Sequence, residues 1–272
     1  MPVVNENKSI GISKSFSIED NKSLLLKGKM KEKYKLVLSY DGTDYCGWQR
    51  QPDKKTIQGM LEEALAKIIG QKVAVIGAGR TDAGVHALAQ AAHFQASTHL
   101  QEKELWRAFN AILPGDIRVI ELEKVDKDFH ARRLAKSKIY QYRIINSPLI
   151  TPFLFRYAFH WPAPLDWQSM AEAAPLFVRE ADFSGFSSNR FLRPIRKVTA
   201  SIINKKESEI IYTIEANGFL RYMVRTIVGT LLEIGKGKMS PLEIDKIFHT
   251  KSRSLAGPTA PAKGLCLIKV NY

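Results

Sequence analysis

Residues 77–84 carry the clearest potential for chemistry, and they read Gly-Ala-Gly-Arg-Thr-Asp-Ala-Gly after a short apolar stretch. Glycines in that setting are typical of dinucleotide-binding loops. The spacing argues against such a loop because position 82, where the third glycine would stand, holds an aspartate. The context argues against it as well, since an alternating strand pattern follows where a helix N-terminus should receive the pyrophosphate. The segment therefore offers a carboxylate and no phosphate cradle.

Asp82 is open to two interpretations. An aspartate between threonine and Ala-Gly is most often a turn former that accepts hydrogen bonds from its own backbone. Arg80 stands two positions away, and an arginine close to the carboxylate is expected to keep Asp82 ionised and to lower its pKa. An ionised carboxylate in a basic protein is also a candidate for covalent catalysis.

Other patterns for catalysis or metal binding are absent from the sequence. His86 and His93 stand seven positions apart, so a single strand would turn them to opposite faces. There is no His-Glu-x-x-His motif, no cluster of cysteines, no Gly-x-Ser-x-Gly elbow and no Gly-Lys-Ser/Thr phosphate loop. We expect no metal site, and we expect each histidine to be hydrogen-bonded in the core or exposed.

The overall charge points to a polyanionic partner. The chain has 272 residues, with 41 Lys and Arg against 27 Asp and Glu, a net charge of +14. Nucleic acid is the leading candidate and a membrane surface the second, although no helix has the pattern of a basic amphipathic anchor. Lysines that only keep the protein soluble are the plain alternative. No apolar stretch is long enough to span a membrane, and the two distant cysteines, Cys46 and Cys266, suit a reducing cytosol.

The hydrophobic periodicity divides the chain into an extension and two halves. Residues 1–30 lack a sustained apolar pattern, and we expect a flexible extension there. In residues 31–134 the pattern predicts strand, helix, strand, strand, helix, strand, which is the ferredoxin-like order. The predicted elements are strands over 34–40, 73–76, 85–95 and 117–125 and helices over 57–68, between Thr56 as N-cap and Gly70, and over 102–113.

The order repeats in residues 135–272. The predicted elements are strands over 139–145, 195–203, 209–216 and 265–270 and helices over 166–178, over 219–234 and from Pro241. We therefore expect an α+β fold in which two ferredoxin-like halves with antiparallel sheets join around a central basic cleft. A parallel α/β sheet would also alternate strands with helices, but the two predicted hairpins argue against it.

Several motifs together resemble one family. Nine consecutive residues, Gly79-Arg80-Thr81-Asp82-Ala83-Gly84-Val85-His86-Ala87, are similar to the active-site motif of the TruA family of tRNA pseudouridine synthases. The resemblance covers roughly residues 31–272. The other segments that resemble the family, in the family's order, are Tyr40-Asp41-Gly42-Thr43, Gly47-Trp48-Gln49-Arg50-Gln51, Phe129-His130-Ala131-Arg132, Tyr140-x-Tyr142-Arg143, Phe219-x-x-x-Met223-Val224-Arg225 and Ala262-Lys263-Gly264-Leu265.

The resemblance implies an activity and a set of roles. The family converts uridine to pseudouridine at positions 38, 39 and 40 in the anticodon stem-loop of tRNA, without a cofactor or a catalytic metal. It implies that Asp82 is the catalytic nucleophile, by attack on C6 of the base, attack on C1′ of the sugar, or removal of a ribose proton to give a glycal. Tyr140 would stack on the target base, Arg225 would pair with the carboxylate, and Arg80 would help to hold the flipped nucleotide. Members form homodimers with the tRNA across both subunits.

The residues themselves are consistent with these roles and leave alternatives. Tyr140 lies on an aromatic strand face that Tyr142 shares. Arg221 and Arg225 are one helical turn apart in a strongly apolar predicted helix, where an arginine must reach solvent or find an anion, and Asp82 is a suitable one. Further basic residues are candidates for contacts with the RNA backbone, which set affinity and register. These candidates are Arg132, Arg143, Arg196 and Arg221.

Two function classes remain from the sequence. The first is a cytoplasmic, homodimeric tRNA pseudouridine synthase, an isomerase. The second is a non-catalytic RNA-binding protein, because paired ferredoxin-like modules also bind RNA, although the aromatic segments of RNA-recognition modules are absent from this sequence.

Overall fold

The computed structural model describes residues 31–188 and 193–272. The extension expected over residues 1–30 lies outside this part of the chain. Over the described ranges, no helix combines the length and apolarity that a membrane crossing requires.

The first half of the chain forms elements close to those predicted. β1 buries every second side chain, as the alternation of Leu36 and Leu38 with polar residues indicates. The helix that follows it begins at Thr56, whose side chain accepts a hydrogen bond from the Gly59 amide, and ends at Gly70 in a left-handed conformation with φ of 78°. The elements are β1 (Glu32–Tyr40), α2 (Ile57–Ile69), β2 (Ile76–Gly77), β3 (His86–Ala96), α3 (Glu102–Ile112) and β4 (Ile117–Val125).

The second half begins with the strand that carries Tyr140. Its elements are β5 (Ser137–Ile145), β6 (Phe159–His160), α4 (Trp167–Ala173), β7 (Glu180–Asp182), β8 (Ile195–Lys206), β9 (Glu209–Ala216), α5 (Met223–Gly235), α6 (Glu243–Thr250) and β10 (Leu265–Asn271). Short 3₁₀ turns cover Ala174–Phe177, Ser184–Phe186, Arg253–Leu255 and Ala262–Gly264.

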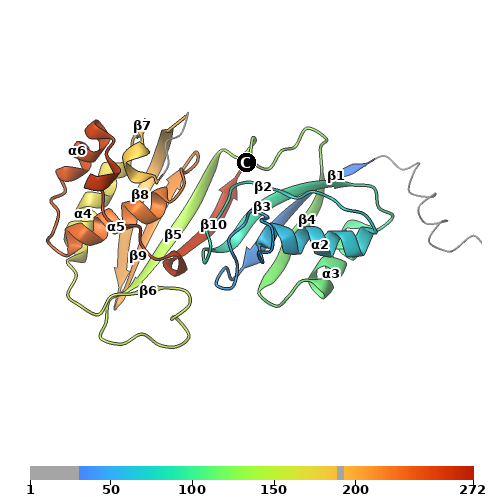
Figure 1. Ribbon diagram of the computed structural model, residues 1–272, viewed down its shortest axis with the longest axis horizontal. Coiled ribbons are helices and arrows are strands. Elements are labelled where there is room, and N and C mark those ends of the chain that lie inside the picture. The colour runs from blue at the N-terminus through green and yellow to red at the C-terminus, as the bar shows by residue number, and fades with distance from the viewer. Residues whose placement is uncertain (1–30, 189–192) are drawn as a thin grey trace, which may run out of the picture.

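One mixed, mostly antiparallel sheet runs through both halves (Figure 1). Its strand order over the described residues is β4-β1-β3-β10-β5-β9-β8-β7, with β2 beside β3 and β6 beside β5. In each half the order is fourth strand, first, third and second: β4-β1-β3-β2, and β10-β5-β9-β8. β10 pairs antiparallel with β5 and parallel with β3, where Cys266 faces His86 and Leu267 faces Ala87. The last strand therefore joins the halves, and a parallel doubly wound sheet is ruled out.

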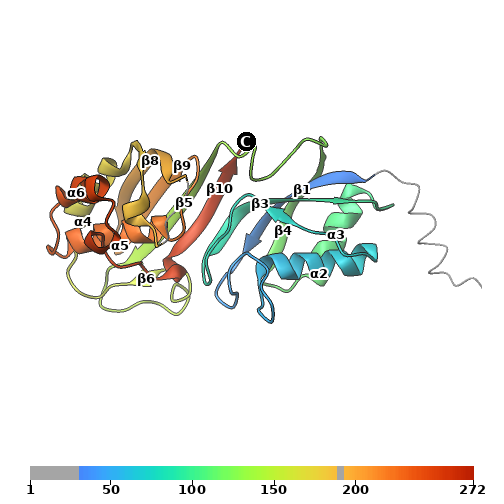
Figure 2. The ribbon, with the colours of Figure 1, turned by 45° about the horizontal axis from the view of Figure 1, so that its top comes forward.

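Helices cover the sheet separately in each half. Figures 1 and 2 show α2 and α3 beside β1, β3 and β4, and α4, α5 and α6 beside β8 and β9. α5 is buried along nearly its whole length, which its apolar sequence requires. At Gly229 of α5 an added Cβ would lie 1.7 Å from the Pro258 carbonyl oxygen, so glycine permits the following loop to lie directly on the helix.

Four predicted elements were wrong in their limits by three residues or more. The strand predicted over 195–203 continues to Lys206, and the other three have a cause in the structure. The strand predicted over 73–76 is reduced to β2, because side chains of α2 take up the backbone of Val75: its amide donates to Glu62 and its carbonyl accepts from Gln58. The helix predicted over 166–178 ends as an α-helix at Ala173, and Pro175 opens a 3₁₀ turn because proline lacks the amide that a continuing helix needs. The helix predicted over 219–234 begins only at Met223.

The late start of α5 has a backbone cause. Tyr222, which precedes the helix, has a left-handed conformation with φ of 62°. That conformation is unfavourable for a bulky L-residue and cannot continue a right-handed helix. Arg221 therefore lies outside the helix, and the prediction that Arg221 and Arg225 share one helical face was wrong.

Candidate active site

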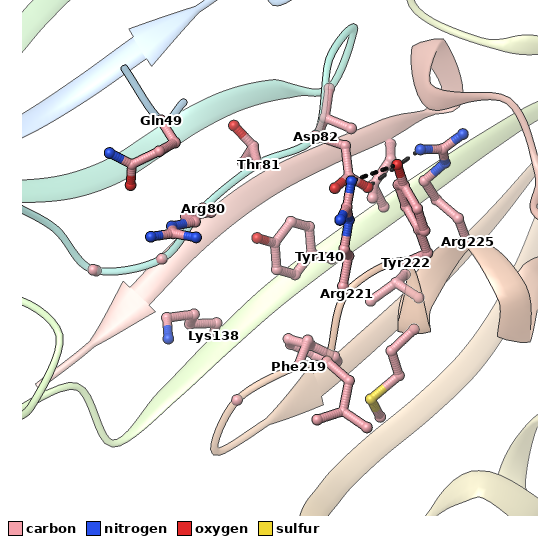
Figure 3. Close-up of a pocket in the computed structure, with 18 of the residues that line it drawn as sticks. Gln49, Arg80, Thr81, Asp82, Lys138, Tyr140, Phe219, Arg221, Tyr222 and Arg225 are labelled. Carbon is pink, nitrogen blue, oxygen red and sulfur yellow. Dashed lines mark hydrogen bonds and ion pairs between the residues drawn. The ribbon is translucent and has the colours of Figure 1, made fainter. Parts of the chain in front are cut away.

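A pocket of about 1050 Å³ opens where the two halves meet (Figure 3). Its walls come from the loop before β3, from β5 and from the segment that leads into α5. Of the predicted site residues, Arg80, Asp82, Arg132, Tyr140, Arg196, Arg221 and Arg225 line it. The pocket therefore gathers side chains from positions far apart in the sequence.

Asp82 and Arg225 form an ion pair inside this pocket. The Nη1 atom of Arg225 donates a hydrogen bond to Oδ2 of Asp82 at 3.2 Å, and both side chains are mostly buried. Arg225 is fixed from its other side as well, because its Nε donates to the Ala260 carbonyl at 2.7 Å and its own carbonyl accepts from the Ala260 amide. The bond at Nε fixes the plane of the guanidinium, and its Nη1 group is directed at the carboxylate.

Two opposing effects set the pKa of Asp82. Burial raises this pKa above the ordinary aspartate value, and the nearby charge of Arg225, followed by that of Arg221, limits the rise. The expectation that Arg80 lowers the pKa was wrong. Burial outweighs the nearby cations, the cations that act on Asp82 are Arg225 and Arg221, and Arg80 points away from Asp82 (Figure 3).

Backbone contacts hold the loop that carries Asp82. The Trp48 amide donates to the Thr81 carbonyl at 3.0 Å, and the Thr81 hydroxyl lies 2.9 Å from the Tyr40 hydroxyl. An added Cβ at Gly42 would lie 2.0 Å from the Val85 carbonyl oxygen, so the turn after β1 lies directly against the loop. Asp82 is therefore held by contacts on both of its flanks.

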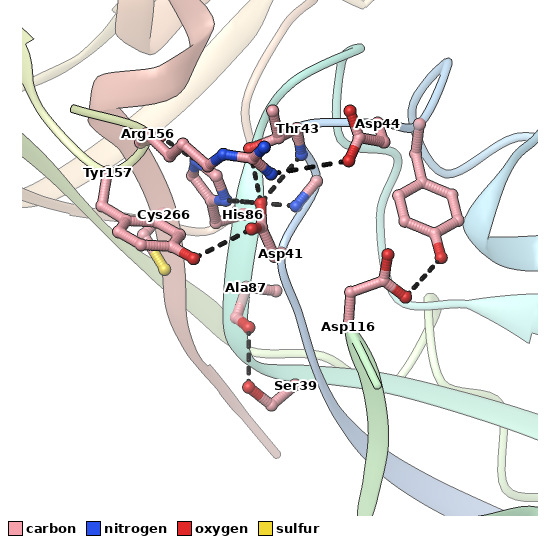
Figure 4. Close-up of polar contacts among 12 residues, drawn as sticks. Ser39, Asp41, Thr43, Asp44, His86, Ala87, Asp116, Arg156, Tyr157 and Cys266 are labelled. Atoms are coloured by element: carbon pink, nitrogen blue, oxygen red, sulfur yellow. Dashed lines mark hydrogen bonds and ion pairs between the residues drawn. The ribbon is translucent and has the colours of Figure 1, made fainter. Parts of the chain in front are cut away.

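His86, the first residue of β3, holds this turn by a hydrogen bond to its backbone (Figure 4). Its Nδ1 accepts the Gly42 amide at 3.1 Å, and its Nε2 lies 3.0 Å from the Arg156 carbonyl. Because Nδ1 accepts the Gly42 amide, Nε2 is the nitrogen that donates to the Arg156 carbonyl. Burial lowers the pKa of His86, and Asp41, 3.1 Å from Nδ1, opposes this shift. Tyr157 then donates to the other carboxylate oxygen of Asp41 at 2.9 Å. The loop before β6 is thereby tied to the first half.

Tyr140 presents its ring to the pocket from β5. It is 7% exposed, and its ring packs edge-to-face on Phe219 with centroids 5.2 Å apart. Burial raises its pKa, so the phenol is protonated. The alternative aromatic, Tyr142, is fully buried, donates to the Pro261 carbonyl at 2.8 Å and does not line the pocket. Of the two tyrosines, only Tyr140 can meet a ligand there.

The sequence reasoning missed Tyr222. Its ring lies between two arginines, with the guanidinium carbons of Arg221 and Arg225 at 5.0 and 5.1 Å from the ring centroid. The Nη2 atom of Arg221 also donates to the Tyr222 hydroxyl at 3.3 Å. The sequence offered one sign of Tyr222, an aromatic residue near two arginines at the start of a helix. Its left-handed backbone could not be predicted, because that conformation is typical of glycine and asparagine and not of tyrosine.

Cations gather on another wall of the pocket. Burial, then the charges of Arg132 and Arg196, lower the pKa of Lys138, which places these three cations close together. Within the described ranges none of the three forms an ion pair with a carboxylate. Arg143 differs from them: it pairs with Glu209 and lies outside the pocket lining. The same part of the chain contains no group of three or more His, Cys, Asp or Glu side chains arranged to hold a metal ion.

Comparison with known proteins covers most of the chain, including the loop that carries Asp82 and the segment that leads into α5. A family model described as tRNA pseudouridine synthase matches residues 36–132 and 173–272. The tRNA pseudouridine synthase A of Caldicellulosiruptor bescii is 43% identical over 239 residues, which are 87% of this chain and 98% of that protein. The protein of the same name from Brevibacillus brevis is 43% identical over 244 residues, 89% of this chain and 100% of that protein. The chain therefore belongs to the tRNA pseudouridine synthase family, in the group called tRNA pseudouridine synthase A, or TruA.

Proposed function

We propose that this protein isomerises uridine to pseudouridine at positions 38, 39 and 40 in the anticodon stem-loop of tRNA, with Asp82 as the catalytic nucleophile. Membership of the family supports tRNA as the substrate and uridine isomerisation as the reaction. The observation that supports the role of Asp82 is its ion pair with Arg225 in the wall of a pocket of about 1050 Å³. Small-ligand sites commonly measure about 300–1,000 Å³, so the pocket has room for a nucleoside.

The reaction breaks one bond and forms another in the same nucleotide. The bond between N1 of the base and C1′ of the ribose breaks, the base turns, and C5 bonds to C1′. The hydrogen on C5 leaves as a proton, and N1 gains one, so no oxidant or reductant is needed. An ionised Asp82 serves all three routes open to a carboxylate: attack on C6, attack on C1′, or removal of a ribose proton.

The base must leave its stack before any of these routes can begin. Extrusion costs a few kcal/mol, and stacking on an aromatic side chain returns about 1–3 kcal/mol per base. Tyr140 would supply such a ring in the pocket, and Arg80, which lines the same pocket, would help to hold the flipped nucleotide. Arg225 keeps the carboxylate of Asp82 ionised and oriented.

Further parts of the proposal concern binding and assembly. Four arginines are proposed contacts with the tRNA backbone: Arg132, Arg196, Arg221 and Arg143. Arg143 differs from the others because it forms an ion pair with Glu209. We propose that residues 31–134 and 135–272 are two ferredoxin-like domains with a basic cleft between them, which the repeated strand order supports. We also propose that the protein acts in the cytoplasm as a homodimer, so light scattering should give twice the chain mass of 30.7 kDa.

Tritium release from C5-labelled uridine in tRNA tests the activity. Wild-type protein should release tritium, and Asp82→Asn should release none while folding and tRNA binding persist. Asp128→Asn is the matched control, because Asp128 is an exposed carboxylate outside the pocket. Release by the Asp82 variant would falsify the nucleophile assignment. Binding without release by wild-type protein would favour the alternative, a non-catalytic RNA-binding protein.

A further inference from the structure

Two histidines hold the short turn that joins the two halves. The amide of Ala131 donates to Nδ1 of His93 at 3.2 Å. The amides of Arg132 and Arg133 both donate to Nδ1 of His130, at 3.2 and 3.4 Å. Three successive backbone amides therefore donate hydrogen bonds to imidazole nitrogens.

The shape of the turn explains why these acceptors are needed. The amide of Leu134 donates to the His130 carbonyl at 3.0 Å, which closes a single helical turn. The first amides of a helical turn have no carbonyl partner within it, and a side chain or water must accept from them. Here the two imidazoles do so, with ring centroids 4.8 Å apart. Tyr272 donates to the Ala131 carbonyl at 2.8 Å, so the turn is tied from the opposite side too.

The turn places Arg132 in the wall of the active-site pocket. Arg132 lines that pocket and is close enough to lower the pKa of the buried Lys138. Its guanidinium has no ion-pair partner among the residues that the structure describes. The position of this free cation therefore depends on the backbone of the turn.

The acceptor role requires both rings to be neutral at Nδ1, and their surroundings favour the neutral form. Burial first, then the charges of neighbouring groups, lower the pKa of His93 to about 4, and burial and nearby arginines lower that of His130. The charged groups that face the pair are Lys33 on β1, Lys31 and Lys72 at the rim of the hollow above the rings, and Arg132 and Arg133 on the turn itself. Among the residues that the structure describes, no acidic side chain lines that hollow.

We propose that His93 and His130 are positioning residues for tRNA binding, which hold Arg132 in the pocket wall by accepting the amides of its turn. The proposal rests on the proposed function, since tRNA is the ligand that Arg132 would meet. It assigns His130 the role of an uncharged acceptor, in contrast to a cation that contacts phosphate directly.

The first test uses tRNA affinity and a double-mutant cycle. His130→Ala and Arg132→Ala should each raise the Kd for tRNA by roughly tenfold and reduce the slope of log Kd against log salt by about one, as expected for the loss of one phosphate contact. The double variant should be no weaker than Arg132→Ala. Losses that multiply in the double variant would overturn the proposal, because they would show that His130 acts independently of Arg132.

The second test replaces the ring nitrogen by an amide oxygen. Asparagine at position 130 presents an acceptor where Nδ1 lies and carries no titratable proton. His130→Asn should keep the Kd within about twofold of wild type and should keep the wild-type salt slope. An Asn variant as weak as His130→Ala would overturn the proposal, because it would show that the acceptor atom is not what His130 supplies.

The pH dependence separates an acceptor from a cation. Protonation at Nδ1 removes the acceptor, and the pKa of His130 is lowered, so the wild-type affinity should fall relative to that of His130→Asn as the pH is taken from 7.5 to below the ordinary histidine pKa. A histidine cation that contacts phosphate would make the wild type gain affinity over the same range, and that result would overturn the proposal. A wild-type protein that neither binds tRNA nor releases tritium overturns the proposed function as well, whereas failure of the Asn rescue in an active protein overturns only the positioning role.

Discussion

Oδ2 of Asp82 lies 3.2 Å from Nη1 of Arg225, although 143 positions separate the two residues in the chain. The carboxylate belongs to a loop of the first half, and the guanidinium belongs to the first turn of α5 in the second half. Neither half alone contains the pair. The ionisation of Asp82 therefore depends on how the halves are joined, and this dependence leads to measurable predictions.

Loss of the Arg225 charge should change the pH profile of pseudouridine formation. The proposed mechanism needs Asp82 ionised, so the rate should fall as pH drops through the pKa of Asp82. Burial raises this pKa and Arg225 opposes the rise. Arg225→Gln should therefore raise the pKa further and move the acid limb of the single-turnover rate to higher pH. Arg221→Gln should move it in the same direction by less. An acid limb unchanged in Arg225→Gln would contradict the ionisation model.

Changes at Tyr140 should separate stacking from the role of its hydroxyl. Tyr140→Phe keeps the ring that packs on Phe219, so the KM for tRNA should stay near the wild-type value. Tyr140→Ala removes the ring and should lower kcat/KM by about 5- to 150-fold, which corresponds to about 1–3 kcal/mol of stacking. Steady-state tritium release measures both constants. A Phe variant as impaired as the Ala variant would show that the hydroxyl, and not stacking, dominates.

Gly42→Ala should loosen the loop that carries Asp82. The added methyl would lie 2.0 Å from the Val85 carbonyl oxygen, and this overlap is expected to lower the free energy of unfolding by about 1–3 kcal/mol. The catalytic rate should fall as well, because the Val85 amide donates to the Asp82 carbonyl and so helps to fix the loop. Gly115→Ala is the control, since its nearest neighbour is 4.0 Å from the added carbon. Chemical denaturation of both variants measures the difference, and equal stabilities would contradict the assigned contact.

Two arginines proposed to bind the RNA backbone should differ in effect. Arg196 lines the pocket and has no carboxylate partner among the described residues, whereas Arg143 shares its charge with Glu209. Arg196→Ala should weaken tRNA binding and reduce the salt slope by about one. Arg143→Ala should change both quantities less. Titrations at several salt concentrations provide the comparison, and a larger effect at Arg143 would reverse the assignment.

Local elements were predicted correctly from the sequence where the apolar periodicity and the capping residues agreed. β1 and α2 follow their apolar patterns, and the Thr56 and Gly70 caps lie where predicted. The strand predicted over 73–76 was shortened because two side chains of α2 took its hydrogen bonds, a tertiary effect with no local signal. The start of α5 was misplaced because Phe219 and Leu220 continue the apolar pattern, while the Tyr222 backbone ends it.

The candidate site was likewise predicted only in part from the sequence. Asp82 stood out in the sequence because a carboxylate replaced an expected glycine. The pKa of Asp82 was predicted in the wrong direction, because the sequence shows Arg80 nearby and gives no measure of burial. His93 and His130 could not be linked to Arg132 from the sequence either. Their role depends on which ring nitrogen faces which amide, and only the folded turn determines that.

The position of β10 has a consequence for the timing of activity. Residues 265–271 are the last described strand to leave the ribosome, yet they lie at the centre of the sheet between β3 and β5. Chains grow at about 5–20 residues per second, and earlier segments fold while the remainder is still being made. A growing chain that has not yet added β10 would hold Asp82 and Arg225 on halves that no strand pairing of the described sheet joins. We therefore expect the proposed site to assemble only after residues 265–271 have emerged.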